Sequence, residues 1–323
     1  MLNCFVPEPQ GLTRLDPPPA VIPEHCLWVD LFEPTLEEEK AVEQFLTVDV
    51  PTREEMREIE TSNRLYEEDG ALYMTATIVT RIDTDRPEAA AITFILVRNK
   101  LITNRYHDPL PFRRYTAYAQ RHPAAASSAL AVLTGLLEAV IERSADILER
   151  VSADLDELSA SIFATRERRQ DTSRDLRGVM ERIARIGDLV SKSRESLVSL
   201  GRLLSYVQQS SSVSLTPDLR SRFKTLSRDV LALADHASFL SSKTSFMLEA
   251  TLGLINIEQN DIIKIFSVAA VAFLPPTLIA SIYGMNFHFM PELDWKLGYP
   301  LALLLMVASA VIPYVYFRRR GWL

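Results

Sequence analysis

Short apolar runs separated by polar segments fill the first third of the chain. Three of these runs are rich in β-branched and aromatic residues, which is typical of strands, and they lie at residues 26–31, 72–79 and 91–97. A turn at Asn99 and Lys100 leads directly into a further apolar run, so we expect a hairpin there. This part, residues 1–125, is therefore predicted to form a small α/β domain.

The pattern changes after the His122-Pro123 break, where apolar residues begin to recur every three or four positions, as on one face of a helix. One such stripe runs over residues 130–162, and a second runs over residues 176–207. Residues 126–216 are therefore predicted to form two long antiparallel helices.

A third helix is predicted to begin at Thr216, a suitable N-cap, with Pro217 in its first turn. Its apolar pattern continues to Tyr283, and at 1.5 Å per residue the helix would be about 100 Å long. That length is roughly three times the thickness of the hydrocarbon core of a bilayer. Residues 217–264 are accordingly predicted to be a stalk that leads into a membrane span.

Two segments near the C-terminal end, residues 265–287 and 298–317, contain no charged residue. Each reaches the roughly 20 residues that a helix needs to cross a bilayer. They predict two transmembrane helices joined by a short outer loop, residues 288–297. Two helices cannot enclose a water-filled path, so a conducting protein of this kind must be a homo-oligomer.

Positive charge after the second span predicts the orientation in the membrane. The tail, residues 318–323, begins with three arginines, and the positive-inside rule places such a cluster in the cytoplasm. The first ten residues, MLNCFVPEPQ, show no basic segment followed by an apolar one, so we expect no export of the large domain. Both termini are therefore predicted to be cytoplasmic, with the chain embedded in the lipid bilayer of the cell inner membrane.

Composition and motifs narrow the function. The net charge of −7 excludes a generally basic nucleic-acid binder. Cys4 and Cys26 show neither a CxxC spacing nor a framework of pairs, which favours reduced thiols. The sequence contains no Walker, GxSxG or HExxH motif, and its five histidines lie far apart. We therefore expect neither an enzyme nor a resident cofactor.

Two short motifs flank the outer end of the first span: YGMNF at residues 283–287 and MPEL at residues 290–293. Together, ahead of a basic tail, they resemble the CorA family of magnesium transporters. The runs INIEQNDIIKIFSV (255–268) and FLPPTLIAS (273–281) are similar to its enterobacterial branch.

The resemblance implies an α+β cytoplasmic domain, an α/β sandwich with long helices, joined by a long stalk helix to two C-terminal transmembrane helices. It further implies a homopentameric channel for Mg²⁺, Co²⁺ and Ni²⁺, with the first span lining the pore and the second forming an outer ring. Mg²⁺ bound between cytoplasmic domains would close the pore, although no spacing of acidic residues identifies the regulatory site.

The same resemblance places a selectivity filter at Gly284, Met285 and Asn286. Mg²⁺ releases water slowly and prefers oxygen ligands, so a fast pathway should accept the hydrated ion through neutral oxygen atoms. The Asn286 side chain and the Gly284 and Met285 carbonyls offer such atoms, and glycine permits the chain to leave the helix there. The competing interpretation is a plain helix cap with a flexible glycine.

Five further residues match pore-facing positions of the family's first span: Asn260, Ile263, Phe266, Leu274 and Thr277. The two polar residues would form rings that accept hydrogen bonds from the ion's water, and the three apolar ones would form constrictions able to close by dewetting. Packing against helix or lipid is the alternative for Phe266 and Leu274. The pair Pro275-Pro276 is predicted to kink the helix.

Acidic residues at both ends of the pathway complete the predicted site. Glu292 and Asp294 in the outer loop would raise the local cation concentration. Glu249 matches an acidic ring at the cytoplasmic mouth of the family's pore. For the two loop acids, ordinary solvation is an equally simple explanation.

The absence of an ATP-binding motif predicts passive entry of the ion. For a divalent cation, an inside-negative potential supplies roughly 4 to 5 kcal/mol per 100 mV. Two alternatives remain open at this stage. One is a zinc or other transition-metal transporter of the same architecture, and the other is a membrane-tethered coiled-coil scaffold that transports nothing.

Overall fold

The computed structural model describes residues 1–19, 21–82, 84, 86–163, 176–286, 288 and 290–321, without the side chains of residues 292 and 293. The chain forms two compact units, Met1–Met247 and Leu248–Leu323. Cys4 and Cys26 are buried, free thiols, as predicted.

The first unit contains a seven-stranded sheet. Its strands are β1 (Leu2–Glu8), β2 (Gly11–Arg14), β3 (Trp28–Phe32), β4 (Leu65–Glu68), β5 (Ala71–Thr80), β6 (Glu88–Val97) and β7 (Lys100–Arg105). Their order is β2-β1-β3-β7-β6-β5-β4. Only the central β3–β7 pair is parallel, and the other five pairs of neighbouring strands are antiparallel.

Two hairpins at one side of this sheet use two-residue turns. Arg98 and Asn99 connect β6 to β7, and both have left-handed backbone conformations, with φ of 47° and 59°. The predicted hairpin is therefore confirmed, but its turn lies one residue earlier than Asn99-Lys100, because Lys100 already pairs with Val97. Asp69 and Gly70 form the equivalent turn between β4 and β5, with φ of 49° and 74°.

The helices of the first unit are α1 (Leu36–Leu46), α2 (Thr61–Arg64), α3 (Leu110–Ala119), α4 (Ala129–Phe163), α5 (Leu176–Gln209) and the first part of α6 (Pro217–Tyr283), with short 3₁₀ turns η1 (Glu55–Arg57) and η2 (Pro123–Ala126). The two long helices predicted before residue 216 are therefore present as α4 and α5. Thr216 begins α6 as expected, since its hydroxyl oxygen accepts a hydrogen bond from the Leu219 N–H at 3.4 Å.

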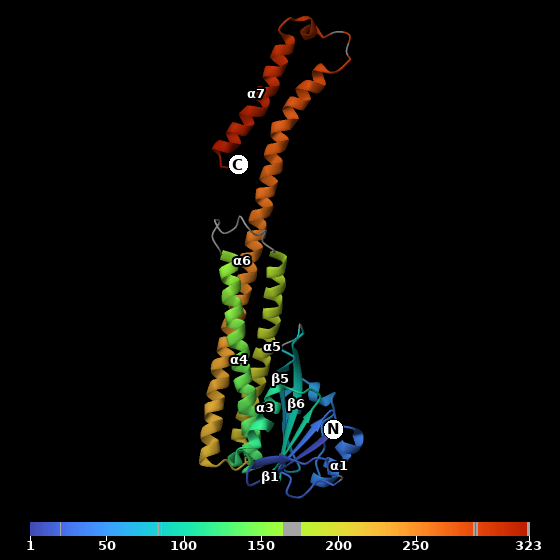
Figure 1. Cartoon of the computed structure of the whole chain (residues 1–323), viewed down its shortest axis with the longest axis vertical. Helices are drawn as coiled ribbons and strands as arrows, with labels where there is room; N and C mark the ends of the chain where they lie inside the picture. Colours follow the sequence, from blue (N-terminus) through green and yellow to red (C-terminus); the bar gives the residue numbers. More distant parts are fainter. Residues whose placement is uncertain are drawn as a thin grey trace. The chain divides into compact units, whose positions relative to one another are not determined.

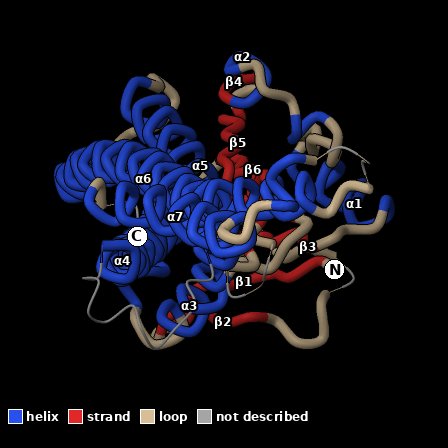
Figure 2. Tube along the Cα trace, turned by 90° about the horizontal axis from the view of Figure 1, so that it is seen from above, coloured by secondary structure: helices blue, strands red, loops and turns tan. Residues whose placement is uncertain are grey.

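Helices cover both faces of the sheet, with α1 on one side and α4 and α5 on the other (Figures 1 and 2). Successive side chains of β3 point to opposite faces of the sheet, so the strand contributes to the core on both sides. Val29 and Leu31 join a buried cluster with Val42 and Leu46 of α1. Trp28 faces the opposite layer, where it lies against Phe112 and Tyr115 of α3 and stacks on Phe5, with ring centroids 4.2 Å apart. The result is the predicted α/β sandwich.

A buried ion pair ties the two central strands together. Arg105 on β7 donates two hydrogen bonds to the carboxylate of Asp30 on β3, at 2.8 and 2.9 Å. Thr103 and Asn3 donate to the same carboxylate at 2.8 and 3.2 Å. The Arg105 guanidinium also lies 4.4 Å from the ring centroid of Phe32. The charges are thus compensated where water is excluded.

The second unit contains the remainder of α6, the 3₁₀ turn η4 (Pro291–Asp294) and α7 (Gly298–Arg319). Both α6 and α7 are long and apolar enough to cross a membrane. The helix α6 runs through Pro275 and Pro276 without interruption, so a kink at this pair stays a prediction. Residues 287, 322 and 323, which end the predicted first span and the basic tail, lie outside the described residues.

Candidate functional site

The predicted filter lies where α6 ends. The helix stops at Tyr283, and the N–H of Gly284 still donates to the carbonyl of Ala280 at 3.0 Å. The N–H of Met285 reaches only as far as Ile282, at 3.3 Å, so the last turn is tightened before the chain leaves the helix. Gly284 is not among the glycines with a positive φ, so it does not end the helix in a left-handed conformation. Both the filter and the plain helix cap with a flexible glycine stay open as interpretations.

The side chain of Asn286 lies at the surface of the single chain. The residue is exposed and lies outside regular secondary structure, and Met285 beside it is 48% exposed. Among the described residues, no hydrogen bond involves the Asn286 side chain. Its oxygen atom is thus available to accept hydrogen bonds from the water shell of a cation.

The five predicted pore-lining residues form one stripe on α6. At about 100° per residue, Asn260, Ile263, Phe266, Leu274 and Thr277 fall within an arc of roughly 120°. All five are exposed in the single chain. Large apolar side chains stay uncovered within this stripe, since Phe266 is 70% and Leu274 is 65% exposed.

Several positions on the opposite face of the same helix segment are less exposed. Val268 is buried, and Asp261, Lys264, Ala272 and Ile279 are half-buried. These positions lie within roughly 80° of one another and are centred about 150° away from the predicted stripe. The helix α7 runs beside this part of α6 (Figures 1 and 2). The five residues of the predicted pore face are all exposed in the single chain.

A local hydrogen bond fixes the orientation of the Thr277 hydroxyl group. Its hydroxyl donates to the carbonyl of Phe273 at 2.7 Å, so the hydroxyl oxygen presents only lone pairs to the exposed side. An oriented acceptor of this kind suits the water shell of a cation. Pro275 and Pro276 lack an N–H group, so they donate no helical hydrogen bond to the turn that precedes Thr277.

Two of the three predicted acidic residues have exposed side chains in the structure. Asp294 ends the η4 turn and is exposed, and Glu249 is exposed on α6. The side chain of Glu292 lies outside the described part of the chain. Asp261 pairs with Lys264 at 2.8 Å on the less exposed side of α6, away from the predicted stripe.

Several acidic residues of the first unit are paired within the chain. Asp156 contacts Lys243 at 2.6 Å, and Asp188 contacts Lys192 at 2.6 Å. Within the described residues, no group of three or more His, Cys, Asp or Glu side chains is arranged to hold a metal ion. The residues of a regulatory site therefore stay unassigned.

Comparison with known proteins decides the family. A family model described as CorA-like Mg²⁺ transporter protein matches residues 23–319. The chain belongs to the CorA family. It is 36% identical to the magnesium transport protein CorA of Mannheimia succiniciproducens and 35% identical to that of Escherichia coli strain K12. Both alignments span 323 residues and cover 100% of each chain.

A solved CorA structure has the same fold. The complete structure of the CorA magnesium transporter from Methanocaldococcus jannaschii matches with a TM-score of 0.78 at 22% identity, covering 100% of this chain and 99% of that one. The predicted architecture of an α+β domain, a long helix and two C-terminal apolar helices is thus confirmed. As a member of the CorA family with two candidate membrane helices, the chain is a membrane transport protein and not an enzyme.

Proposed function

We propose that this chain is one subunit of a channel that conducts hydrated Mg²⁺ and also admits Co²⁺ and Ni²⁺. The observation that carries the proposal is the position of Asn286 just beyond the end of α6 in a CorA-family chain, with no hydrogen bond to its carboxamide among the described residues. Several copies around one axis would bring these carboxamides, with the carbonyls of Gly284 and Met285, into a ring of neutral acceptors.

Neutral oxygen atoms fit the chemistry of the ion. A carboxylate cage would hold Mg²⁺ tightly and slow its release, whereas conduction requires binding that is weak enough to leave. Hydrogen bonds from coordinated water to Asn286, and further down to Thr277 and Asn260, would guide the hydrated ion without removing its shell. Glu292 and Asp294 would concentrate cations at the outer mouth.

Entry would be passive and gated by the apolar part of the stripe. An inside-negative membrane potential supplies roughly 4 to 5 kcal/mol per 100 mV for a divalent ion, which favours influx without a pump. Rings of Ile263, Phe266 and Leu274 would close the pathway by excluding water. High intracellular Mg²⁺ would favour the closed state by bridging acidic faces of neighbouring subunits, with Glu249 at the cytoplasmic mouth.

The assembly that this mechanism requires is a homopentamer in the cell inner membrane with both termini in the cytoplasm. The free stripe on α6 supports it, because all five of its side chains are exposed in the single chain. Five copies of α6 would then enclose the pore and five copies of α7 would form the outer ring.

The test is Mg²⁺ uptake by liposomes that contain the purified protein under an inside-negative potential. Wild type and Asn286→Ala are compared, with Asn63→Ala in the exposed helix α2 as the matched control. We expect saturable uptake that cobalt hexammine blocks in wild type and control, and a loss of at least about tenfold in Asn286→Ala. Uptake of Co²⁺, Ni²⁺ and Zn²⁺ is measured in the same vesicles.

Each contrary result has a definite meaning. Full uptake by Asn286→Ala would show that the filter lies elsewhere. Zn²⁺ uptake well above Mg²⁺ uptake would favour a transition-metal transporter of the same fold. No uptake by any correctly inserted protein would favour a membrane-tethered scaffold.

A further inference from the structure

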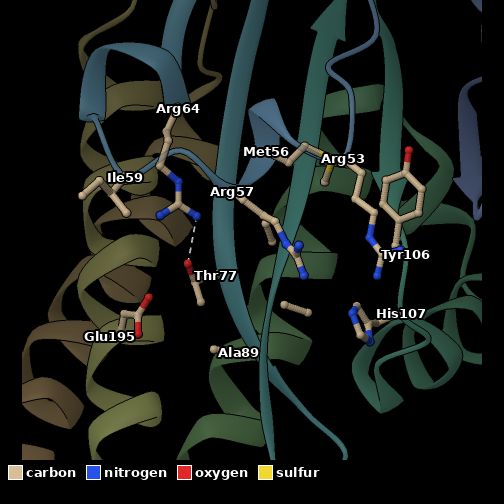
Figure 3. A pocket seen from close by; sticks show the side chains of 12 residues that line it. Arg53, Met56, Arg57, Ile59, Arg64, Thr77, Ala89, Tyr106, His107 and Glu195 are labelled. Carbon is tan, nitrogen blue, oxygen red and sulfur yellow. Dashed lines mark hydrogen bonds between the residues drawn. The ribbon is translucent and has the colours of Figure 1, made fainter.

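Two neighbouring cavities in the first unit are lined by arginine side chains. The smaller, of about 150 Å³, lies between the η1 and α2 segment, strands β5 and β6 and helix α5, and its basic residues are Arg53, Arg57, Arg64 and His107. The larger, of about 500 Å³, shares Ile59, Arg64 and Glu195 with it and adds Arg194 and Arg202. Figure 3 shows Arg53 and Arg57 directing their guanidinium groups toward His107.

The positive charge of these cavities is not balanced by the chain. Among the described residues, none of the five arginines forms an ion pair within 4 Å. Glu195 is the one carboxylate residue that lines either cavity. Glu88, which lies 3.7 Å from His107, is already engaged by Arg81 at 2.8 Å. Five guanidinium groups therefore face a single acid in a chain whose net charge is −7.

Arg64 joins the two cavities and is incompletely satisfied. Its Nη2 donates to the Thr77 hydroxyl at 2.8 Å, but its buried Nε has no hydrogen-bond partner. Burial lowers the pKa of the Arg64 guanidinium, with Glu195 opposing and Arg202 adding to that effect. A buried charged donor without a partner costs free energy, which an acceptor entering the cavity would recover.

The remaining arginines make only weak contacts. Arg202 lies 3.5 Å from the Thr61 hydroxyl, and Arg53 lies 5.2 Å from the centroid of the Tyr106 ring. Guanidinium groups match phosphate oxygens through paired hydrogen bonds, and several of them around one cavity recognise more than one phosphate. A divalent cation is excluded by the same charges.

We propose that these two cavities bind a small anion that carries two or more linked phosphate groups. One phosphate would lie between Arg53, Arg57 and Arg64, and the chain would continue toward Arg194 and Arg202. A single orthophosphate would engage only one end of the site. The proposal assumes that the first unit faces the cytoplasm, where nucleotides and inorganic polyphosphates occur, and it does not depend on ion conduction.

The experiment is calorimetric titration of the full-length protein in lipid nanodiscs with sodium tripolyphosphate, ATP, AMP and orthophosphate at physiological salt. The variants are Arg53→Gln/Arg57→Gln and Arg194→Gln/Arg202→Gln, with each pair exposed at the surface. Arg121→Gln/Arg220→Gln is the matched control, because these two arginines are also exposed and line neither cavity.

We expect one tripolyphosphate per chain and much weaker binding of orthophosphate and AMP. Each cavity variant should lose at least about tenfold in affinity, whereas the control pair should bind as wild type does. Equal affinities for tripolyphosphate and ATP would identify the phosphate chain as the ligand, and tighter ATP binding would identify a nucleotide. Asn286→Ala should bind normally, which separates this proposal from that of conduction.

Two outcomes would overturn the proposal. Absence of tripolyphosphate and ATP binding, or an equal loss in the control pair, would leave only nonspecific attraction. The other outcome is a change in the number of subunits of the cavity variants, together with no heat of anion binding in wild type. It would show that the arginines form ion pairs with carboxylates of a second copy of the chain.

Discussion

At the scale of single residues, a buried ion pair joins two strands of the first unit. Asp30 and Arg105 have side chains that are only 4% and 8% exposed, and both oxygen atoms of the carboxylate accept from the guanidinium. Hydrogen bonds from Thr103 and Asn3 complete the shell of Asp30. A buried pair of this kind holds its two strands in one register because either charge alone would be strongly unfavourable.

Replacing Asp30 by Asn should therefore be costly. Removing one partner of a buried pair typically destabilises by about 3–5 kcal/mol, so we expect a clearly lower midpoint of thermal unfolding for the full chain. Glu181→Gln is the control, since Glu181 and Arg177 pair at 3.3 Å with side chains 65% and 90% exposed. That change should cost only a few tenths of a kcal/mol. Equal shifts would contradict the importance of burial.

His107 should make stability depend on pH. Burial lowers its pKa, Glu88 opposes that effect, and Arg81 and Arg53 add to it. The folded chain then binds fewer protons than the unfolded chain, so the stabilising contribution is full above the unfolded pKa of about 6.5 and is lost as the pH falls through it. Unfolding midpoints measured between about pH 7.5 and 5.5 should fall less steeply in His107→Asn than in wild type. Parallel curves would contradict this assignment.

At the scale of secondary-structure elements, close packing of α3 on α4 depends on a glycine. A Cβ atom at Gly135 would lie 2.2 Å from Cε2 of Tyr115, whose ring is buried. At Gly201 in α5 the nearest atom would be Cγ1 of Val230 at 3.4 Å, an ordinary contact. Alanine has the same helical propensity at both positions, but only Gly201 leaves enough room for its Cβ atom.

Alanine substitutions at these two glycines should therefore have opposite effects. Gly135→Ala should destabilise by about 1–3 kcal/mol through overpacking, even though alanine is the better helix former. Gly201→Ala should be neutral or stabilising by up to about 1 kcal/mol. Thermal unfolding of both proteins, followed by circular dichroism, decides the matter, and equal destabilisation would contradict the packing argument.

The long helices α4, α5, α6 and α7 and the strands β3, β5, β6 and β7 were predictable because their patterns are local, whereas the short helices α1, α2 and α3 and the strands β1 and β2 were not predicted. The stripes of α4, α5 and α6 repeat every three or four residues, and the periodicity alone specified which side of each helix is apolar. The hairpin of β4 and β5 was missed although its Asp69-Gly70 turn is one of the strongest local signals for such a structure. The short strand β4 (Leu65–Glu68), half-buried or exposed, carries too little apolar character to be recognised by hydrophobicity.

At the scale of the whole molecule, we predict that several copies of the chain assemble around one pore. Five copies should be found when the protein in nanodiscs is measured by native mass spectrometry, because the free stripe on α6 has to be covered by other copies of the same face. Phe266→Glu, within the stripe, should reduce the assembled fraction, whereas Ile257→Glu, which is 57% exposed but lies away from the stripe, should not. A monodisperse monomer in wild type would contradict the pore model.

The sequence by itself determined the membrane spans, the three long helices, the stripe on α6 and the motif at its end. Each of these depends on residues that are close together in the chain or repeat with a fixed period. Only the tertiary structure showed that α7 runs beside α6 and that Asp30 meets Arg105. It alone brought Arg53, Arg57 and Arg64 to the same cavities as Arg194 and Arg202. Such contacts join elements far apart in the sequence, and no local pattern encodes which of them will pack together.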